Sequence, residues 1–279
     1  MQRREFLGAN ALVLASGTLA AADKLAAAEP AKADHADQPN HLTAEVQMQF
    51  MRPGQLEAAG RKFPVVYVPF GLIEWHGRHL PLGNDAIKAH GILVKCAVGF
   101  GGVVYPPVYF HAGFKQEHLV PVLTDLFTRL KRTGFRVILG VSGHNVREQI
   151  EMIDKALAPV IADGTVTGKG YWEMTLSQGP ESSSDHAAKW ETSNMMFLYP
   201  ELVDMAELGD GPLNLDMKPP SGIGGQDPRK HASAKVGQRN VERAAEALGR
   251  KAKELLESLP EDNRSFNLKA VSPEHWWLV

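Results

Sequence analysis

The sequence predicts a three-layer α/β/α domain in which helices cover both faces of a mostly parallel central sheet. Short runs of β-branched and aromatic residues alternate with stretches of helical periodicity, a pattern typical of parallel βαβ units. The 279 residues are 44% hydrophobic and 22% charged, which supplies one large core and excludes a chain that is disordered throughout.

Three short apolar runs are the expected strands. The first covers residues 63–70 (FPVVYVPF), and we expect Gly71 to end it. The second covers residues 135–141 (FRVILGV), and a third lies within residues 165–176. Residues 103–110 (VVYPPVYF) are also apolar, but their two prolines restrict them to a sheet edge or a loop.

Helical periodicity fills most of the chain between and after these runs. Asn84 or Asp85 can cap the first helix, and Gly134 suits the end of the second. The expected helices cover residues 84–98, 117–133, 147–162, 191–199 and 233–259. Cys96 falls on the apolar face of the first helix, so we expect it in the core.

Residues 1–28 are predicted to be an export signal and not part of the fold. Arg3 and Arg4 precede an apolar run at residues 11–22, which is too short to be a stable membrane anchor. The paired arginines before Phe-Leu resemble a twin-arginine signal. We therefore expect a periplasmic or extracellular protein whose mature form has no membrane anchor.

The export signal is followed by a linker and one domain. Residues 29–45 are polar, with little reason to order, so we expect a disordered linker there and a single domain over residues 46–279. The net charge is −2, which gives no electrostatic case for nucleic-acid binding. Cys96 is the single cysteine, which excludes an internal disulfide and a cysteine-based zinc site.

Carboxylates and imidazoles gather in the polar segments that follow the first two expected strands and in one later segment. Because ligand sites in parallel sheets form beyond the carboxyl ends of strands, the first two of these segments are expected to meet. Such side chains suit Zn²⁺ or Mn²⁺, and two ions that share a carboxylate can activate a water molecule. The residues are Glu74, His76, His79 and Asp85 in the first segment, His144 in the second, and Asp185, His186 and Glu191 in the third.

Three motifs resemble those of the creatininase (creatinine amidohydrolase) family. The segment VPFGLIEWHGRHLPLGNDAIKAHG is similar to a family motif that reads close to GxxEQHGPHLPLxTD. GVSGHN at residues 140–145 is similar to the family's NGHGGN turn, and HAAKWETS at 186–193 resembles HAGExETS. The resemblance spans roughly residues 60–258 and implies the creatininase fold.

Carried over residue by residue, the resemblance implies a two-metal site. Glu74, Asp85 and His144 would hold one ion, and His76 and Asp85 the second, so that Asp85 bridges the two. His186 would be the proton shuttle. The implied cofactor is Zn²⁺ or Mn²⁺, one or two ions per chain.

The chain departs from the family where a further carboxylate ligand is expected, because those two positions hold Lys189 and Val146. Three explanations are open. The Lys189 ammonium replaces the second cation and leaves one metal; Asp185 or Glu191 substitutes as the ligand and two metals remain; or the metal site is vestigial.

The activity that the resemblance implies is hydrolysis of a C–N bond in a small cyclic or linear amide by metal-activated water. In this reading His186 is the acid/base, oriented by Asp185, and Lys189 stabilises the oxyanion. We place His79, Trp75, Arg78 and Glu191 at the substrate pocket. The alternative is a non-catalytic exported binding protein on the same scaffold. The resemblance also implies a ring-like homo-oligomer, such as a hexamer.

Overall fold

The computed structural model describes residues 46–176 and 184–267. The predicted export signal and linker, and the C-terminal Trp276-Trp277, lie outside these residues. Among the helices that are described, none is both long and apolar enough to cross a membrane.

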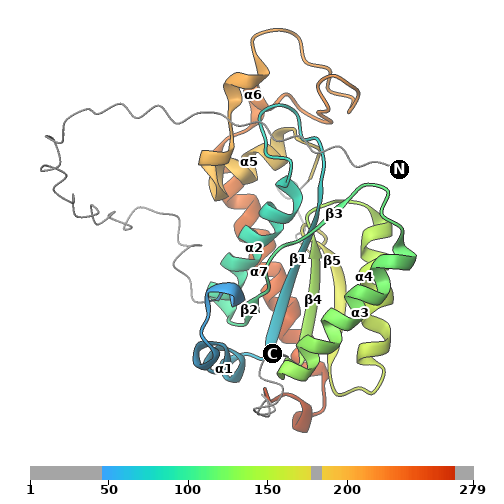
Figure 1. Ribbon diagram of the computed structural model, residues 1–279. Helices are drawn as coiled ribbons and strands as arrows, with labels where there is room; N and C mark the ends of the chain where they lie inside the picture. Colours follow the sequence, from blue (N-terminus) through green and yellow to red (C-terminus); the bar gives the residue numbers. More distant parts are fainter. Residues whose placement is uncertain (1–45, 177–183, 268–279) are drawn as a thin grey trace, which may run out of the picture. The chain divides into compact units, whose positions relative to one another are not determined.

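In the described residues, parallel strands form one sheet with β1 near its centre (Figure 1). β1 (Val65–Ile73) pairs with β4 (Val137–Ser142), and β5 (Thr167–Trp172) lies outside β4. β2 (Val103–Val104) and β3 (Val108–His111) pair with the other side of β1. The prolines predicted to restrict this apolar segment lie between β2 and β3, at the edge of the sheet.

Helices cover both faces of the sheet, which confirms the predicted three-layer fold (Figure 1). One layer holds α2 (Asn84–Phe100), α5 (Lys189–Leu198) and α7 (Ala234–Ser258), and the other holds α3 (Gln116–Thr133) and α4 (Arg147–Ile161).

The two hydrophobic cores follow from the alternation of side chains along a strand. On β1, Val65 and Tyr67 pack toward the layer of α2 and α7, whereas Val66 and Val68 pack toward α3 and α4. All four side chains are fully buried. Cys96 is also buried, in the core on the α2 side, as predicted.

Several element boundaries differ from the prediction by a few residues, and two of these differences bear on the site. β1 continues through Gly71 to Ile73 because β3 supplies a parallel partner for its last four residues. α5 begins at Lys189 and not at residue 191, because the Asp185 carboxylate accepts hydrogen bonds from the first backbone N–H groups of the helix. α1 (Pro53–Lys62) was not predicted from the sequence.

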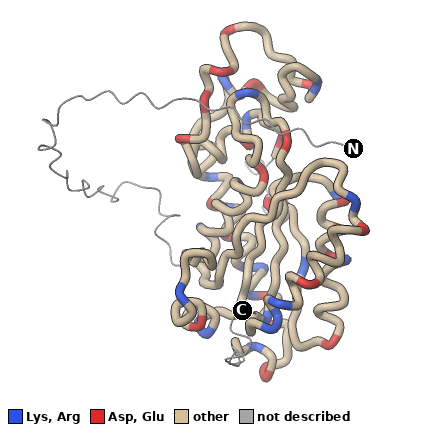
Figure 2. The backbone as a smooth tube through the Cα atoms, viewed as in Figure 1, with Lys and Arg blue, Asp and Glu red and all other residues tan. Residues whose placement is uncertain are grey.

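Charged residues of both signs are intermixed along the described helices (Figure 2). Ion pairs one turn apart join Arg129 to Asp125, Arg147 to Glu151 and Arg250 to Glu246. This distribution agrees with the near-neutral net charge of the chain.

Candidate metal centre

The loops after β1 and β4 meet at the N-terminus of α2. Glu74 directly follows β1, Asp85 is the second residue of α2, and His144 lies in the loop after β4. Two glycines permit this close approach. A Cβ atom at Gly71 would lie 2.2 Å from the backbone nitrogen of Ala86, and one at Gly143 would lie 2.0 Å from the backbone oxygen of Asp85.

Glu74, Asp85 and His144 form the first group of metal-binding side chains. The His144 Nδ1 atom lies 3.0 Å from Glu74 Oε1 and 3.3 Å from Asp85 Oδ2. Burial opposes a charged imidazole, but hydrogen bonds to Asp85 and Glu74 and their negative charges raise the pKa of His144 to about 9. The three ligand atoms lie within 4.8 Å of one another, close enough to share one ion.

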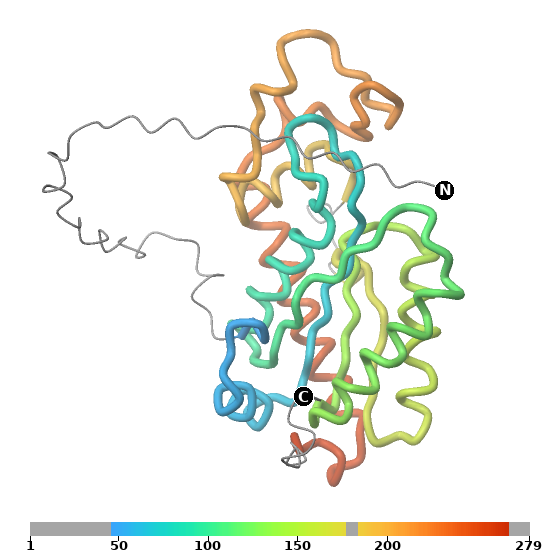
Figure 3. The backbone as a smooth tube through the Cα atoms, viewed as in Figure 1, coloured from blue at the N-terminus to red at the C-terminus, as the bar shows by residue number. Residues whose placement is uncertain are grey.

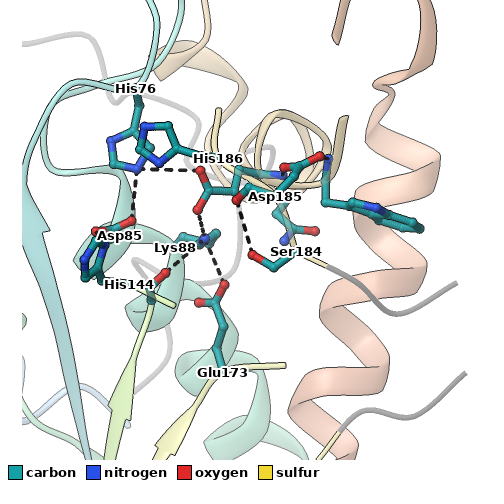
Figure 4. A network of polar contacts seen from close by, with 12 residues as sticks. His76, Asp85, Lys88, His144, Glu173, Ser184, Asp185 and His186 are labelled. Atoms are coloured by element: carbon teal, nitrogen blue, oxygen red, sulfur yellow. Dashed lines mark hydrogen bonds and ion pairs between the residues drawn. The ribbon is translucent and has the colours of Figure 1, made fainter. Parts of the chain in front are cut away.

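His76, Asp85 and Glu191 form the second group, and all three are buried. The His76 Nε2 atom lies 3.0 Å from Asp85 Oδ1 and 3.6 Å from Glu191 Oε2. Asp85 therefore turns one carboxylate oxygen to each group (Figure 4). Burial alone would raise the pKa of Asp85, but hydrogen bonds from His144 and His76 hold it well below its ordinary value.

The orientation of His76 fits a metal ligand. Its Nδ1 atom lies 3.3 Å from the backbone oxygen of Glu74, which can only accept a hydrogen bond, so Nδ1 carries the proton. The Nε2 atom then faces the carboxylates of Asp85 and Glu191. Metal-binding histidines commonly donate their other ring N–H in this way. Imidazole nitrogens and carboxylate oxygens are also the donor set that Zn²⁺ and Mn²⁺ accept.

His186 lies beside both groups. Its ring stacks on that of His76, with centroids 4.5 Å apart, and its Nδ1 atom lies 3.9 Å from Glu74 Oε1. Its Nε2 atom lies 2.9 Å from the backbone oxygen of Trp75 and therefore donates to it. In the neutral imidazole this leaves Nδ1 as the free base, on the side of the metal-binding groups.

Lys88 and Glu173 are both buried and lie in contact next to the second group (Figure 4). Neither residue was predicted from the sequence. The Lys88 Nζ atom lies 2.9 Å from Glu173 Oε1 and also contacts Glu191 Oε1. Burial raises the pKa of Glu173 to about 8, although Lys88 opposes the shift. The sequence held a sign that Lys88 is buried. Lys88 follows Asp85 by about one helical turn, on a helix side whose other members, such as Ala89 and Ile92, are apolar.

The structure does not bring the Lys189 ammonium into the metal-binding groups. Its Nζ atom lies over the ring of Trp190, 4.3 Å from the centroid. The Asp185 carboxylate accepts hydrogen bonds from the backbone N–H groups of Trp190 and Glu191 at 2.9 and 3.1 Å, and so caps α5. The hypotheses that Lys189 replaces the second cation and that Asp185 orients His186 therefore gain no support from these contacts. Val146 is partly exposed and offers no ligand atom.

The four residues placed at the substrate pocket have different environments. Glu191 belongs to the second metal-binding group. Trp75 is 48% exposed and donates to the backbone oxygen of Ser221, and Arg78 is exposed and faces Glu207. His79 is 1% exposed, and its Nε2 atom lies 2.8 Å from Thr192 Oγ1, so it joins the loop after β1 to α5. Figure 3 shows this loop beside the segment that follows α5. In that segment the backbone N–H of Asp204 donates a hydrogen bond to the backbone oxygen of His79.

The His79 environment predicts a pH-dependent stability. Burial, with the neighbouring His76, lowers the pKa of His79 from 6.5 to about 4. Between these values the unfolded chain binds more protons than the folded chain, so stability falls as the pH falls. We expect His79 to account for a loss of about 2 kcal/mol in unfolding free energy between pH 7.5 and pH 5.

The loss is measured by chemical denaturation of the metal-stripped wild type and the metal-stripped His79→Gln variant. The unfolding free energy of each protein is compared between pH 7.5 and pH 5. His79→Gln should show a shallower decline than the wild type, by about 2 kcal/mol over that interval. His118→Gln, at an exposed position on α3, should keep the wild-type slope. Equal slopes for His79→Gln and the wild type would contradict the assignment.

Comparison with known proteins identifies the family of this chain. A family model described as "Creatininase: Creatinine amidohydrolase" matches residues 49–251. Creatinine amidohydrolase of Pseudomonas putida is 26% identical over 182 residues, which cover 53% of this chain and 69% of that protein. A mycofactocin precursor peptide peptidase of Mycobacterium ulcerans is 26% identical over 170 residues, which cover 53% of this chain and 64% of the peptidase.

Solved creatininase structures share the fold. A creatininase variant complexed with creatine superposes with a TM-score of 0.64 at 18% identity and covers 77% of this chain and 99% of its own. Creatininase with manganese superposes with a TM-score of 0.61 at 20% identity and covers 75% of this chain and 98% of its own. A zinc–zinc form of a creatininase variant superposes with a TM-score of 0.59 at 19% identity and covers 75% of this chain and 97% of its own. Because the family model spans most of the chain and the fold agrees with it, this protein belongs to the creatininase family.

Proposed function

We propose that this protein is a metal-dependent amidohydrolase that cleaves a C–N bond in a small cyclic or linear amide at a two-metal centre. The observation that carries the proposal is the position of Asp85 between two ligand groups, with one oxygen turned to His144 and the other to His76. Glu191 provides the further carboxylate that the positions of Lys189 and Val146 do not. This supports substitution by Glu191 over a one-metal site.

The similar proteins support a hydrolase with divalent metals. The two curated relatives are hydrolases by name, and the solved creatininases include forms with manganese and with zinc. By their names those relatives act on creatinine and on a precursor peptide, so the names support a hydrolase and leave the substrate of this chain open.

The residues of this chain suit the proposed reaction. A bound divalent ion lowers the pKa of water toward ~7 and polarises a carbonyl. Glu74, Asp85 and His144 would hold one ion, and His76, Asp85 and Glu191 the other. The free Nδ1 atom of His186 faces this centre, where it can accept a proton from water and return it to the departing nitrogen. The hydrogen bond to Trp75 keeps the ring in this orientation.

Hydrolysis is tested with the Mn²⁺- or Zn²⁺-loaded protein against creatinine, other small cyclic and linear amides and short peptides, with release of amine or acid as the readout. Turnover of one class that chelation abolishes and metal restores is the expected result. Metal binding without turnover of any class would favour the alternative, a non-catalytic binding protein.

The number of ions follows from the ligand groups. We expect two metal ions per chain in the wild type by elemental analysis, and one in Glu191→Gln, because the amide is a weaker ligand than the carboxylate at the second group. Glu117→Gln, at an exposed position of α3, should retain two. Lys189→Glu should also leave the content unchanged, because the ammonium lies over Trp190. Two ions in Glu191→Gln would exclude Glu191 as a ligand.

We also propose export as the location of this activity. The support is the sequence of residues 1–28 alone, with its paired arginines and short apolar run. Cell fractionation of the full chain and of an Arg3→Lys/Arg4→Lys variant tests it, and cytoplasmic retention of the wild type would contradict it.

A further inference from the structure

Lys88 crosses from α2 to α5 entirely within the protein interior. Its side chain is fully buried. The Nζ atom donates hydrogen bonds to Glu191 Oε1 and, at 3.3 Å, to the backbone oxygen of Gly143, and it lies 2.9 Å from Glu173 Oε1. Of these three partners, Glu191 alone belongs to the second metal-binding group.

The Glu191 carboxylate is held at both oxygens. Lys88 contacts Oε1, and the backbone N–H of Ala187 donates to Oε2 at 2.8 Å. Ala187 has a φ of 51°, in the left-handed region that alanine seldom adopts, so the surrounding contacts must hold it there. The result is that Oε2 faces His76 Nε2 at 3.6 Å.

We propose that Lys88 is a positioning residue that holds one oxygen of Glu191 so that the other faces His76 and Asp85 and completes the second metal-binding group. This role rests on the proposed function. Glu173 contacts the same ammonium at 2.9 Å from another element, so Lys88 is held from two sides. A buried ion pair is seldom needed for stability, since apolar side chains of similar volume often serve as well. A role in orientation gives a reason for its presence here.

The competing role is one of the three explanations left open for Lys189, namely an internal cation that takes the place of the second metal ion. The two roles predict opposite results when the ammonium is removed. A cation that excludes a metal would, on removal, allow the second ion to bind or to bind more tightly. A positioning cation would, on removal, let the Glu191 carboxylate rotate, and the second ion would bind more weakly.

The test is calorimetric titration of the chelator-stripped full chain with Mn²⁺. In Lys88→Met we expect the first equivalent to bind as in the wild type and the second to bind about 10- to 100-fold more weakly, the range typical for partners that orient metal ligands. Lys95→Met, at an exposed position of the same helix, should match the wild type for both equivalents. Melting curves of the metal-free variants check that each one folds.

Because Lys88→Met leaves Glu173 buried without its partner, a second variant protects the test against misfolding. Lys88→Met/Glu173→Met replaces the pair by apolar side chains of similar length and should also lose affinity for the second equivalent alone. Unchanged or tighter second binding in either variant, or a second equivalent gained over a one-metal wild type, would overturn the positioning role. A wild type that binds no metal would contradict the proposed function as well, and is distinguished by the missing first equivalent.

Discussion

Asp85→Asn is expected to weaken both metal equivalents by more than about 100-fold, beyond the effect of losing an orienting partner. Asp85 is 1% exposed, and its two oxygens are turned to different ligand groups, 3.0 Å from His76 Nε2 and 3.3 Å from His144 Nδ1. Asparagine keeps the shape but has one oxygen and no charge, so it cannot serve both groups. Hydrolysis that depends on metal should be lost with the ions.

Titration with Mn²⁺ measures this effect directly, with Asp125→Asn on the exposed surface of α3 as the matched control. The control should bind as the wild type does. Loss of one equivalent alone in Asp85→Asn would contradict a bridging position, and retention of both would exclude Asp85 as a ligand.

His186→Ala is expected to lower kcat by about 10²- to 10⁴-fold, the usual contribution of a positioned acid/base. The metal content should stay at the wild-type value, because both ligand groups that include Asp85 are complete without His186. This combination separates a proton shuttle from a ligand. The substrate for the assay is the amide class that the wild type hydrolyses.

His118→Ala, at an exposed position on α3, should leave both the rate and the metal content unchanged. An unchanged rate in His186→Ala would remove this residue from the mechanism. A loss of metal together with the rate would instead make His186 a ligand. Its Nδ1 atom lies 3.9 Å from Glu74 Oε1, which is close enough for this alternative to be tested.

Much of the fold followed from local patterns. Alternating apolar runs and helical stretches predicted the parallel sheet and its two helical layers, because side-chain periodicity reports which face of an element is buried. The end of β1 was placed too early at Gly71, since the partner that extends it, β3, is separated by more than thirty residues. Non-local pairing of this kind has no signature in the strand itself.

The sequence alone determined the fold class and most of the candidate site. The candidate residues lie in short, continuous sequence motifs that can be recognised without the fold: Glu74, His76, Asp85, His144 and His186. Only the tertiary structure decided which side chains share that site. It turned Lys189 onto Trp190, assigned Asp185 to the start of α5, and brought Lys88 and Glu173 to Glu191. For Lys88 and Glu173 the physical reason is that a buried charge is placed by partners from distant elements, which must meet its desolvation cost together.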